Sequence, residues 1–148
     1  MTSAEISRKN MIDCQIKPNK VTDEALLDIL GRTPRERFVP RHLQAMAYID
    51  EDIPMGNGRY LPEPMVLARL IQEAKIKPTD LVLDVACGTG YSTAIMAQLA
   101  ATVVGVEASK DMADEAERHL RDLDILNVAI IHQNDLRTGY PQQGPYQV

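Results

Sequence analysis

VLDVACGTGY, residues 82–91, is the stretch that decides the fold of this chain. An apolar run that begins at Leu81 leads into a glycine turn, and the spacing from Tyr91 to Leu99 predicts a helix. Because the apolar run is too short for a typical helix, it predicts a buried parallel strand. Gly88 and Gly90 let the backbone approach a ligand where a side chain would block it. The stretch therefore predicts a strand, turn and helix that bind a nucleotide-type cofactor.

Two further strands follow the glycine turn. Residues 102–107 are rich in β-branched side chains, Ser109 is a good cap for a following helix, and residues 128–132 form a third apolar run. Strands and helices thus alternate, and right-handed crossovers place such strands parallel in one sheet. The sequence predicts a doubly wound α/β fold with a mostly parallel, Rossmann-like sheet.

Helices are expected before the sheet. Thr22 is a good N-cap for a helix that Gly31 ends. Pro64 suits the first position of a second helix, which runs to about Ala74. Residues 1–77 are therefore predicted to form an N-terminal helical extension of the sheet.

We expect one domain over residues 1–148, because no flexible linker interrupts it and the pattern simply changes near Pro78. Residues 78–148 then form the cofactor-binding core. The final GPYQV follows a Pro/Gly turn cluster and is typical of the start of another strand. A truncated chain is expected, in which the C-terminal strands are missing and an exposed sheet edge promotes self-association.

Charge and hydropathy exclude several partner classes. The net charge of -5 and pI of about 5.2 provide no basic field for nucleic acid. The N-terminus is polar, and no apolar run approaches the ~18 residues that span a bilayer. We expect a cytoplasmic protein that binds neither nucleic acid nor membrane.

The cysteines and histidines do not form a metal-binding pattern. Cys14 and Cys87 lie far apart without a CxxC spacing, and the three histidines (His42, His119 and His132) lack ligand spacing. No metal is expected. Cys87 is either a nucleophile or a small buried thiol in the turn, and the absence of a nearby histidine favours the thiol.

The residues around the glycine turn discriminate between cofactors. A dinucleotide motif requires glycine or alanine where this sequence has Thr93. Asp84, at the end of the strand, would repel a pyrophosphate, whereas it suits a ligand with an amino group and a sulfonium charge. S-adenosylmethionine has both groups, so the sequence favours it over a nicotinamide cofactor.

Acidic residues also end the next two strands. Glu107 is placed to accept hydrogen bonds from both ribose hydroxyls, and Asp135 to reach the adenine region. Taken singly, each is also typical of a solvated cap or turn, and Asn134-Asp135 is an ordinary turn sequence. Only the recurrence of acidic residues at three strand ends of one sheet favours the cofactor hypothesis.

At this point the sequence resembles the protein-L-isoaspartate O-methyltransferase family, over most of the chain. The resemblance rests on an ordered set of segments: MIDCQIKPNKVTDEALLDIL, TPRERFVP, AYIDEDIPMGNGR, VLDVACGTGY, GVEAS and NVAIIHQNDLRTGYP. It implies the class I methyltransferase fold. It also implies cofactor contacts at six positions: Asp84, Ala86, Gly88, Gly90, Glu107 and Asp135. Ala86 stands where glycine is usual, which is tolerable if its φ is negative.

The segment GNGRYLPEP, residues 56–64, departs from the family. Pro62 stands at the position of the family's active-site serine, so a hydroxyl and a backbone N–H are both lost. Arg59 could pair with an anionic substrate. Two interpretations stay open: a substrate lid, or a surface connection before the helix at Pro64.

The resemblance implies methyl transfer from S-adenosylmethionine to a carboxylate of isoaspartyl residues in proteins or peptides, which leaves S-adenosylhomocysteine. A carboxylate with a pKa of about 4 is already ionised at neutral pH, so no strong base is required. Two alternatives remain: a methyltransferase with a different acceptor, because of Pro62, and a cofactor-binding module without catalysis.

Overall fold

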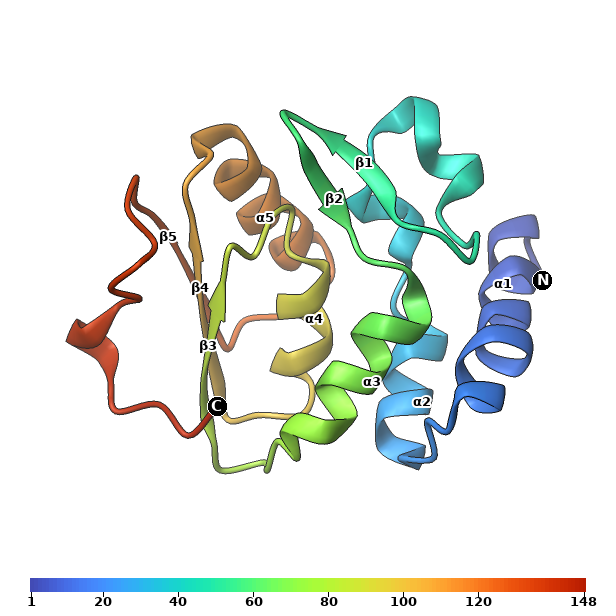
Figure 1. The fold of residues 1–148 in the computed structure, drawn as a ribbon, viewed down its shortest axis with the longest axis horizontal. Helices are drawn as coiled ribbons and strands as arrows, with labels where there is room; N and C mark the ends of the chain where they lie inside the picture. The colour runs from blue at the N-terminus through green and yellow to red at the C-terminus, as the bar shows by residue number, and fades with distance from the viewer. The chain divides into compact units, whose positions relative to one another are not determined.

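The computed structural model describes all residues from Met1 to Val148, in two compact units. The first unit is Met1–Lys75 and the second is Ile76–Val148 (Figure 1). Pro78, where the sequence pattern changes, lies close to this boundary. That residues 1–148 form one domain stays a prediction. No helix combines the length and the apolar character that a membrane crossing requires.

The first unit is mainly helical, as expected. Its α-helices are α1 (Ser3–Asn10), α2 (Glu24–Arg32) and α3 (Pro64–Ala74). Short π and 3₁₀ turns connect them at Met11–Ile16, Lys17–Asn19, Arg35–Phe38 and Arg41–Met46. Helix α1 begins with a capping box in which Thr2 and Glu5 exchange hydrogen bonds. The T-x-x-E spacing is a sequence signal for such a start.

Helix α2 differs from its prediction at both ends. Its N-cap is Asp23, whose side chain accepts a hydrogen bond from the Leu26 N–H over 3.0 Å. The predicted cap, Thr22, is wrong by one residue: the capping acceptor is the Asp23 carboxylate, while the backbone N–H groups of both residues donate to the side chain of Gln72 on α3. The helix also continues through Gly31 to Arg32, so the predicted end at Gly31 was wrong. Helix α3 was predicted correctly.

A two-stranded antiparallel hairpin interrupts the helices of the first unit. Strand β1 (Ile53–Gly56) pairs with β2 (Arg59–Leu61), and Asn57 and Gly58 have positive φ in the turn between them. The Asn-Gly pair is a strong hairpin signal that the sequence analysis did not use. Much of the divergent segment is therefore regular structure.

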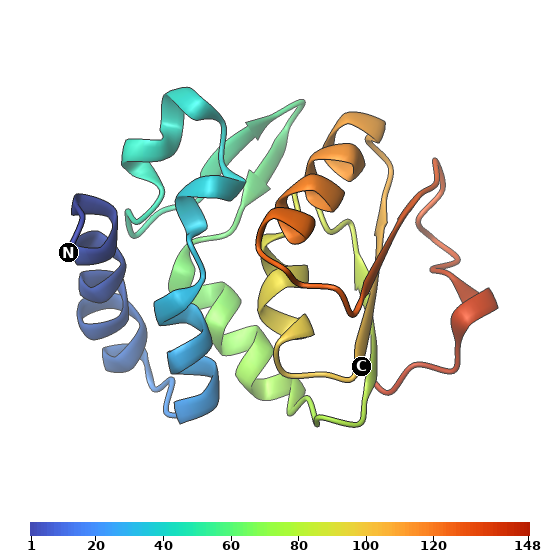
Figure 2. The same cartoon turned by 180° about the vertical axis from the view of Figure 1, so that it is seen from behind.

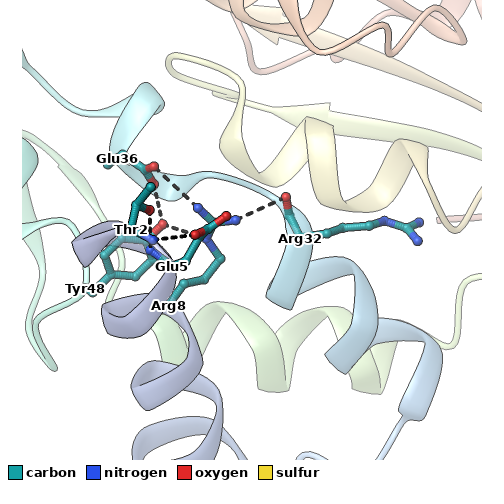
Figure 3. A network of polar contacts seen from close by, with 6 residues as sticks. All are labelled: Thr2, Glu5, Arg8, Arg32, Glu36 and Tyr48. Atoms are coloured by element: carbon teal, nitrogen blue, oxygen red, sulfur yellow. Dashed lines mark hydrogen bonds and ion pairs between the residues drawn. The ribbon is translucent and has the colours of Figure 1, made fainter.

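A part-buried polar network ties α1 to the end of α2 and to the turns that precede the hairpin (Figure 3). Arg8 Nε donates to the Tyr48 hydroxyl over 2.9 Å, and that hydroxyl donates to Glu36. Arg8 also forms an ion pair with Glu36 and donates to the Arg32 carbonyl over 3.3 Å. Burial and the adjacent Glu36 carboxylate both raise the pKa of the Tyr48 phenol. Tyr48 therefore stays protonated and keeps its donor.

The second unit contains the predicted parallel sheet. Its strands are β3 (Leu81–Val85), β4 (Thr102–Glu107) and β5 (Val128–His132), in the order β3-β4-β5. Helices α4 (Tyr91–Ala97) and α5 (Lys110–Asp122) lie on one face, and the segment after β5 lies on the other (Figures 1 and 2). Ser109 caps α5, as predicted. The predicted α/β fold with a parallel sheet is confirmed for this unit.

The C-terminal residues run along the outer edge of β3. The Gln147 N–H donates to the Leu81 carbonyl over 3.0 Å, and the Leu83 N–H donates to the Val148 carbonyl over 2.9 Å. No strand is assigned to these residues, yet they pair with the edge of β3 that β4 does not use. This pairing agrees with the expectation that the final residues begin another strand.

Asn127, immediately before β5, joins three elements of the second unit. Its side-chain amide donates to the carbonyls of Ala97 and Ala101 over 2.7 and 3.1 Å. Its own carbonyl accepts the Val103 N–H over 3.0 Å, which starts the β4–β5 ladder. One residue thus links the end of α4 to both strands.

Candidate cofactor-binding site

The glycine turn after β3 has a left-handed backbone at three alternate positions. Ala86, Gly88 and Gly90 have φ of 59°, 59° and 96°. Alanine at position 86 was expected to be tolerable if its φ is negative. Its φ is positive, so this condition is not met. An alanine in this region costs about 1–2 kcal/mol relative to right-handed backbone. Ala86 is a strained residue in the centre of the candidate site.

The two glycines differ in what surrounds them. A Cβ at Gly88 would meet no heavy atom of the protein within 4 Å, so the backbone there is open to a ligand. A Cβ at Gly90 would lie only 3.1 Å from the Ala116 Cβ on α5. Gly88 thus allows ligand approach, whereas Gly90 allows close packing of the turn on α5.

Asp84 reaches the first turn of α4. Its Oδ2 accepts hydrogen bonds from Ser92 Oγ and Thr93 Oγ1, both over 2.7 Å. Burial raises the pKa of the Asp84 carboxyl and the Glu107 charge raises it further, while the two hydroxyls oppose this shift. Both of these hydrogen bonds fall on Oδ2 and not on Oδ1. Asp84 can therefore accept a donor from a ligand without losing its supporting contacts.

Glu107 holds the glycine turn against β4. The side chain is fully buried, and its two oxygens accept the N–H groups of Gly88 over 2.7 Å and of Ser109 over 2.9 Å. The structure thus places Glu107 against the turn. The observed partners are backbone groups, so the ribose role of Glu107 stays a prediction.

Asp135 does not join the other carboxylates. Its side chain is exposed and pairs with Arg137 Nη2 over 2.7 Å. It also accepts the Arg137 backbone N–H over 3.0 Å, in the manner of an ordinary turn aspartate. The Arg137 guanidinium lowers the pKa of this carboxyl. The adenine contact therefore remains a prediction, and the observed contacts agree with the turn alternative.

Cys87 packs inside the turn. A Cβ at Gly105 of β4 would lie 3.0 Å from the Cys87 Sγ, so the thiol fills the space that this glycine leaves. Burial raises the pKa of the Cys87 thiol to about 12, and the charges of Asp84 and Glu107 act in the same direction. Because the thiolate is the nucleophilic form, the structure supports the small buried thiol.

In the first unit, Pro62 follows strand β2, and its carbonyl has a specific partner. Arg35 is fully buried and donates through Nη2 to the Pro62 carbonyl and through Nε to the Ala47 carbonyl, each over 2.7 Å. This arginine belongs to the RERFVP segment, and the sequence analysis assigned it no role. The signal available was a charged residue between two prolines, which does not reveal a buried partner.

Comparison with known proteins adds the family. The family model for Protein-L-isoaspartate(D-aspartate) O-methyltransferase (PCMT) matches residues 6–148. The chain belongs to this family. A protein-L-isoaspartate O-methyltransferase of Methanoculleus marisnigri is 34% identical over 139 residues, which are 94% of this chain and 63% of that protein. One from Koribacter versatilis is 34% identical over 148 residues, 100% of this chain and 66% of that protein.

Solved structures of PCMT-family proteins agree with the fold. A protein-L-isoaspartate O-methyltransferase superposes with a TM-score of 0.79 at 25% identity, over 94% of this chain and 45% of that one. A structure described as a beta-aspartate methyltransferase (PCMT) from Plasmodium falciparum gives 0.68 at 22% identity, over 93% and 66%. The chain has the α/β methyltransferase fold and spans less than two thirds of the length of the two curated relatives named above.

Proposed function

We propose that this chain binds S-adenosylmethionine and acts as a protein-L-isoaspartate O-methyltransferase. The observation that carries the proposal is the position of the Asp84 carboxylate, held through Oδ2, beside an open glycine turn at the end of β3. The names of the curated relatives support the substrate class, a protein with isoaspartyl residues. A family structure that is described as a complex with S-adenosyl-L-homocysteine supports the cofactor.

The described residues fit this cofactor. The Asp84 carboxylate would accept hydrogen bonds from the ammonium group of its methionyl part, and the backbone at Gly88 would lie against the ligand without a side chain between them. Glu107, which ends β4 and contacts the turn through the Gly88 N–H, would accept hydrogen bonds from the ribose hydroxyls.

When bound, S-adenosylmethionine supplies a methyl group on a positively charged sulfur. The acceptor carboxylate has an ordinary pKa of about 4, so the protein has only to align it and exclude water. Pro62 offers neither a hydroxyl nor an N–H, and its carbonyl accepts from Arg35. We therefore propose that Arg59, at the start of β2, pairs with the substrate carboxylate.

Pro62 also favours a second candidate, methyl transfer to a different acceptor. The cofactor site in the second unit would be the same, because all its residues follow Lys75. Only the contacts to the acceptor would change. Cofactor binding without methylation of an isoaspartyl peptide would support this candidate, or a module without catalysis.

The test is calorimetric titration with S-adenosylhomocysteine of the wild type and of Asp84→Asn. Asparagine keeps an oxygen for Ser92 and Thr93 but removes the charge. We expect micromolar-range binding by the wild type and about tenfold weaker binding by the variant, because the charge-assisted bond is lost. Equal affinities would contradict the assigned position of the ligand. A methylation assay on an isoaspartyl peptide then distinguishes the two candidate functions, methyl transfer to isoaspartyl residues and methyl transfer to a different acceptor.

A further inference from the structure

Helix α5 contacts the glycine turn at two points that lie on one face of the helix. His119 Nδ1 lies 3.0 Å from the Thr89 carbonyl oxygen. One turn earlier, the Ala116 Cβ lies 3.1 Å from the position that a Cβ on Gly90 would take. Residues three apart in a helix are neighbours on its surface, so one stripe of α5 fits against the turn.

The direction of the His119 contact follows from its chemistry. A carbonyl oxygen only accepts hydrogen bonds, so Nδ1 must carry the hydrogen, in either the neutral or the charged form of the ring. Thr89 is buried and stands between the two glycines, whose left-handed backbone is conformationally permissive. The histidine therefore restrains the Thr89–Gly90 peptide from its carbonyl side.

We propose that His119 is a positioning residue of the cofactor site, which fixes the Thr89 peptide so that the backbone at Gly88 faces the ligand. This inference rests on the proposed function, because it assigns the turn to cofactor binding. The histidine acts through the turn and does not touch the ligand. Gly90, packed on Ala116, provides the second fixed point, and its N–H donates to the Cys87 carbonyl over 3.0 Å.

Three substitutions at position 119 separate the hydrogen bond from simple packing. Asparagine places an amide donor at the δ position, where the histidine Nδ1 is. Leucine removes the donor, and glutamine moves it one bond outward. Arg118→Leu, on the exposed side of the same helix, is the matched control for the leucine substitution. Titration with S-adenosylhomocysteine measures affinity, and amide hydrogen exchange at Gly90 measures the order of the turn without a ligand.

We expect His119→Leu and His119→Gln to raise the Kd about three- to tenfold, the usual range for one lost hydrogen bond. His119→Asn and Arg118→Leu should bind like the wild type, and exchange at Gly90 should be faster only in the two weak binders. Equal affinity and exchange in all variants would overturn the proposal. If His119→Leu does not fold, the asparagine and glutamine variants decide.

A wild type that does not bind the ligand would refute the proposed function. The role of His119 in positioning the turn would then be tested by hydrogen exchange alone. Faster Gly90 exchange in the glutamine and leucine variants than in the asparagine variant would then still show that His119 positions the turn. Unchanged exchange would reject that role as well.

Discussion

Thr93 Oγ1 donates a hydrogen bond to Asp84 Oδ2 over 2.7 Å. Thr93 is fully buried, and it occupies the position at which a dinucleotide motif requires glycine or alanine. The residue that departs from the dinucleotide pattern is thus a partner of the carboxylate that distinguishes this site. Thr93 and Asp84 each argue separately against a pyrophosphate ligand, and in the structure their side chains are hydrogen-bonded to each other.

Asp84 should make the protein less stable as the pH rises. Its pKa is raised in the folded state above the ordinary value of 3.8, so between these two values the folded protein binds more protons than the unfolded chain. Stability therefore falls as pH increases through this interval. We expect Asp84→Asn to gain stability relative to the wild type from about pH 4 upward, measured by urea unfolding over a pH series.

The matched control is Asp135→Asn, because Arg137 shifts the pKa of that exposed carboxyl in the opposite direction. Its effect should therefore have the opposite sign, a small loss of stability at neutral pH. A constant difference between Asp84→Asn and the wild type at all pH values would show that Asp84 is not destabilised by burial.

Ala86→Gly should stabilise the protein by about 1 kcal/mol, because glycine adopts the left-handed backbone without steric cost. Gly88 is a matched control, since it has the same φ of 59° and no protein atom within 4 Å of a built Cβ. Gly88→Ala should therefore destabilise by a similar amount. Thermal and urea unfolding measure both, and loss of stability in Ala86→Gly would contradict the assigned strain.

Arg35→Met should destabilise the first unit by about 2–4 kcal/mol, because the carbonyls of Ala47 and Pro62 lose buried donors. Arg37→Met, two residues later and exposed, should change stability by less than about 0.5 kcal/mol. Chemical denaturation of both variants is the measurement. Equal effects would mean that the Arg35 hydrogen bonds contribute little.

Cys14 should react with a thiol reagent in the native protein, whereas Cys87 should not. Cys14 is exposed, while Cys87 is buried and its pKa is raised to about 12. Mass spectrometry after brief alkylation at neutral pH should find one label, and two labels after unfolding. Rapid native labelling of Cys87 would show that the glycine turn opens readily.

The sheet could be predicted from the sequence because its strands are short apolar runs between strong turn signals. The bounds of β4 and β5 were confirmed, and β3 begins at the predicted Leu81. The end of α2 was less predictable, since a helix tolerates glycine near its C-terminus at a cost of about 1 kcal/mol. The Asn57-Gly58 hairpin and the Thr2 capping box had sequence signals that were simply not used.

The candidate site could be predicted only in part. Asp84 and the glycines follow from their place at the end of a strand, which local pattern determines. Arg35 and His119 act through partners distant in sequence, and nothing in their own neighbourhood indicates those partners. The φ of Ala86 also could not be predicted, because alanine ordinarily favours negative φ.

Asn127 has a consequence for how the third strand is assembled. Parallel strands have evenly spaced hydrogen bonds and thus little intrinsic preference for one alignment over its neighbours. A shift of β5 by one residue would reverse which of its side chains face the helices, and would also pull Asn127 from the carbonyls of Ala97 and Ala101. The hydrogen bonds between Asn127 and the end of α4 therefore disfavour any alignment of β5 other than the observed one.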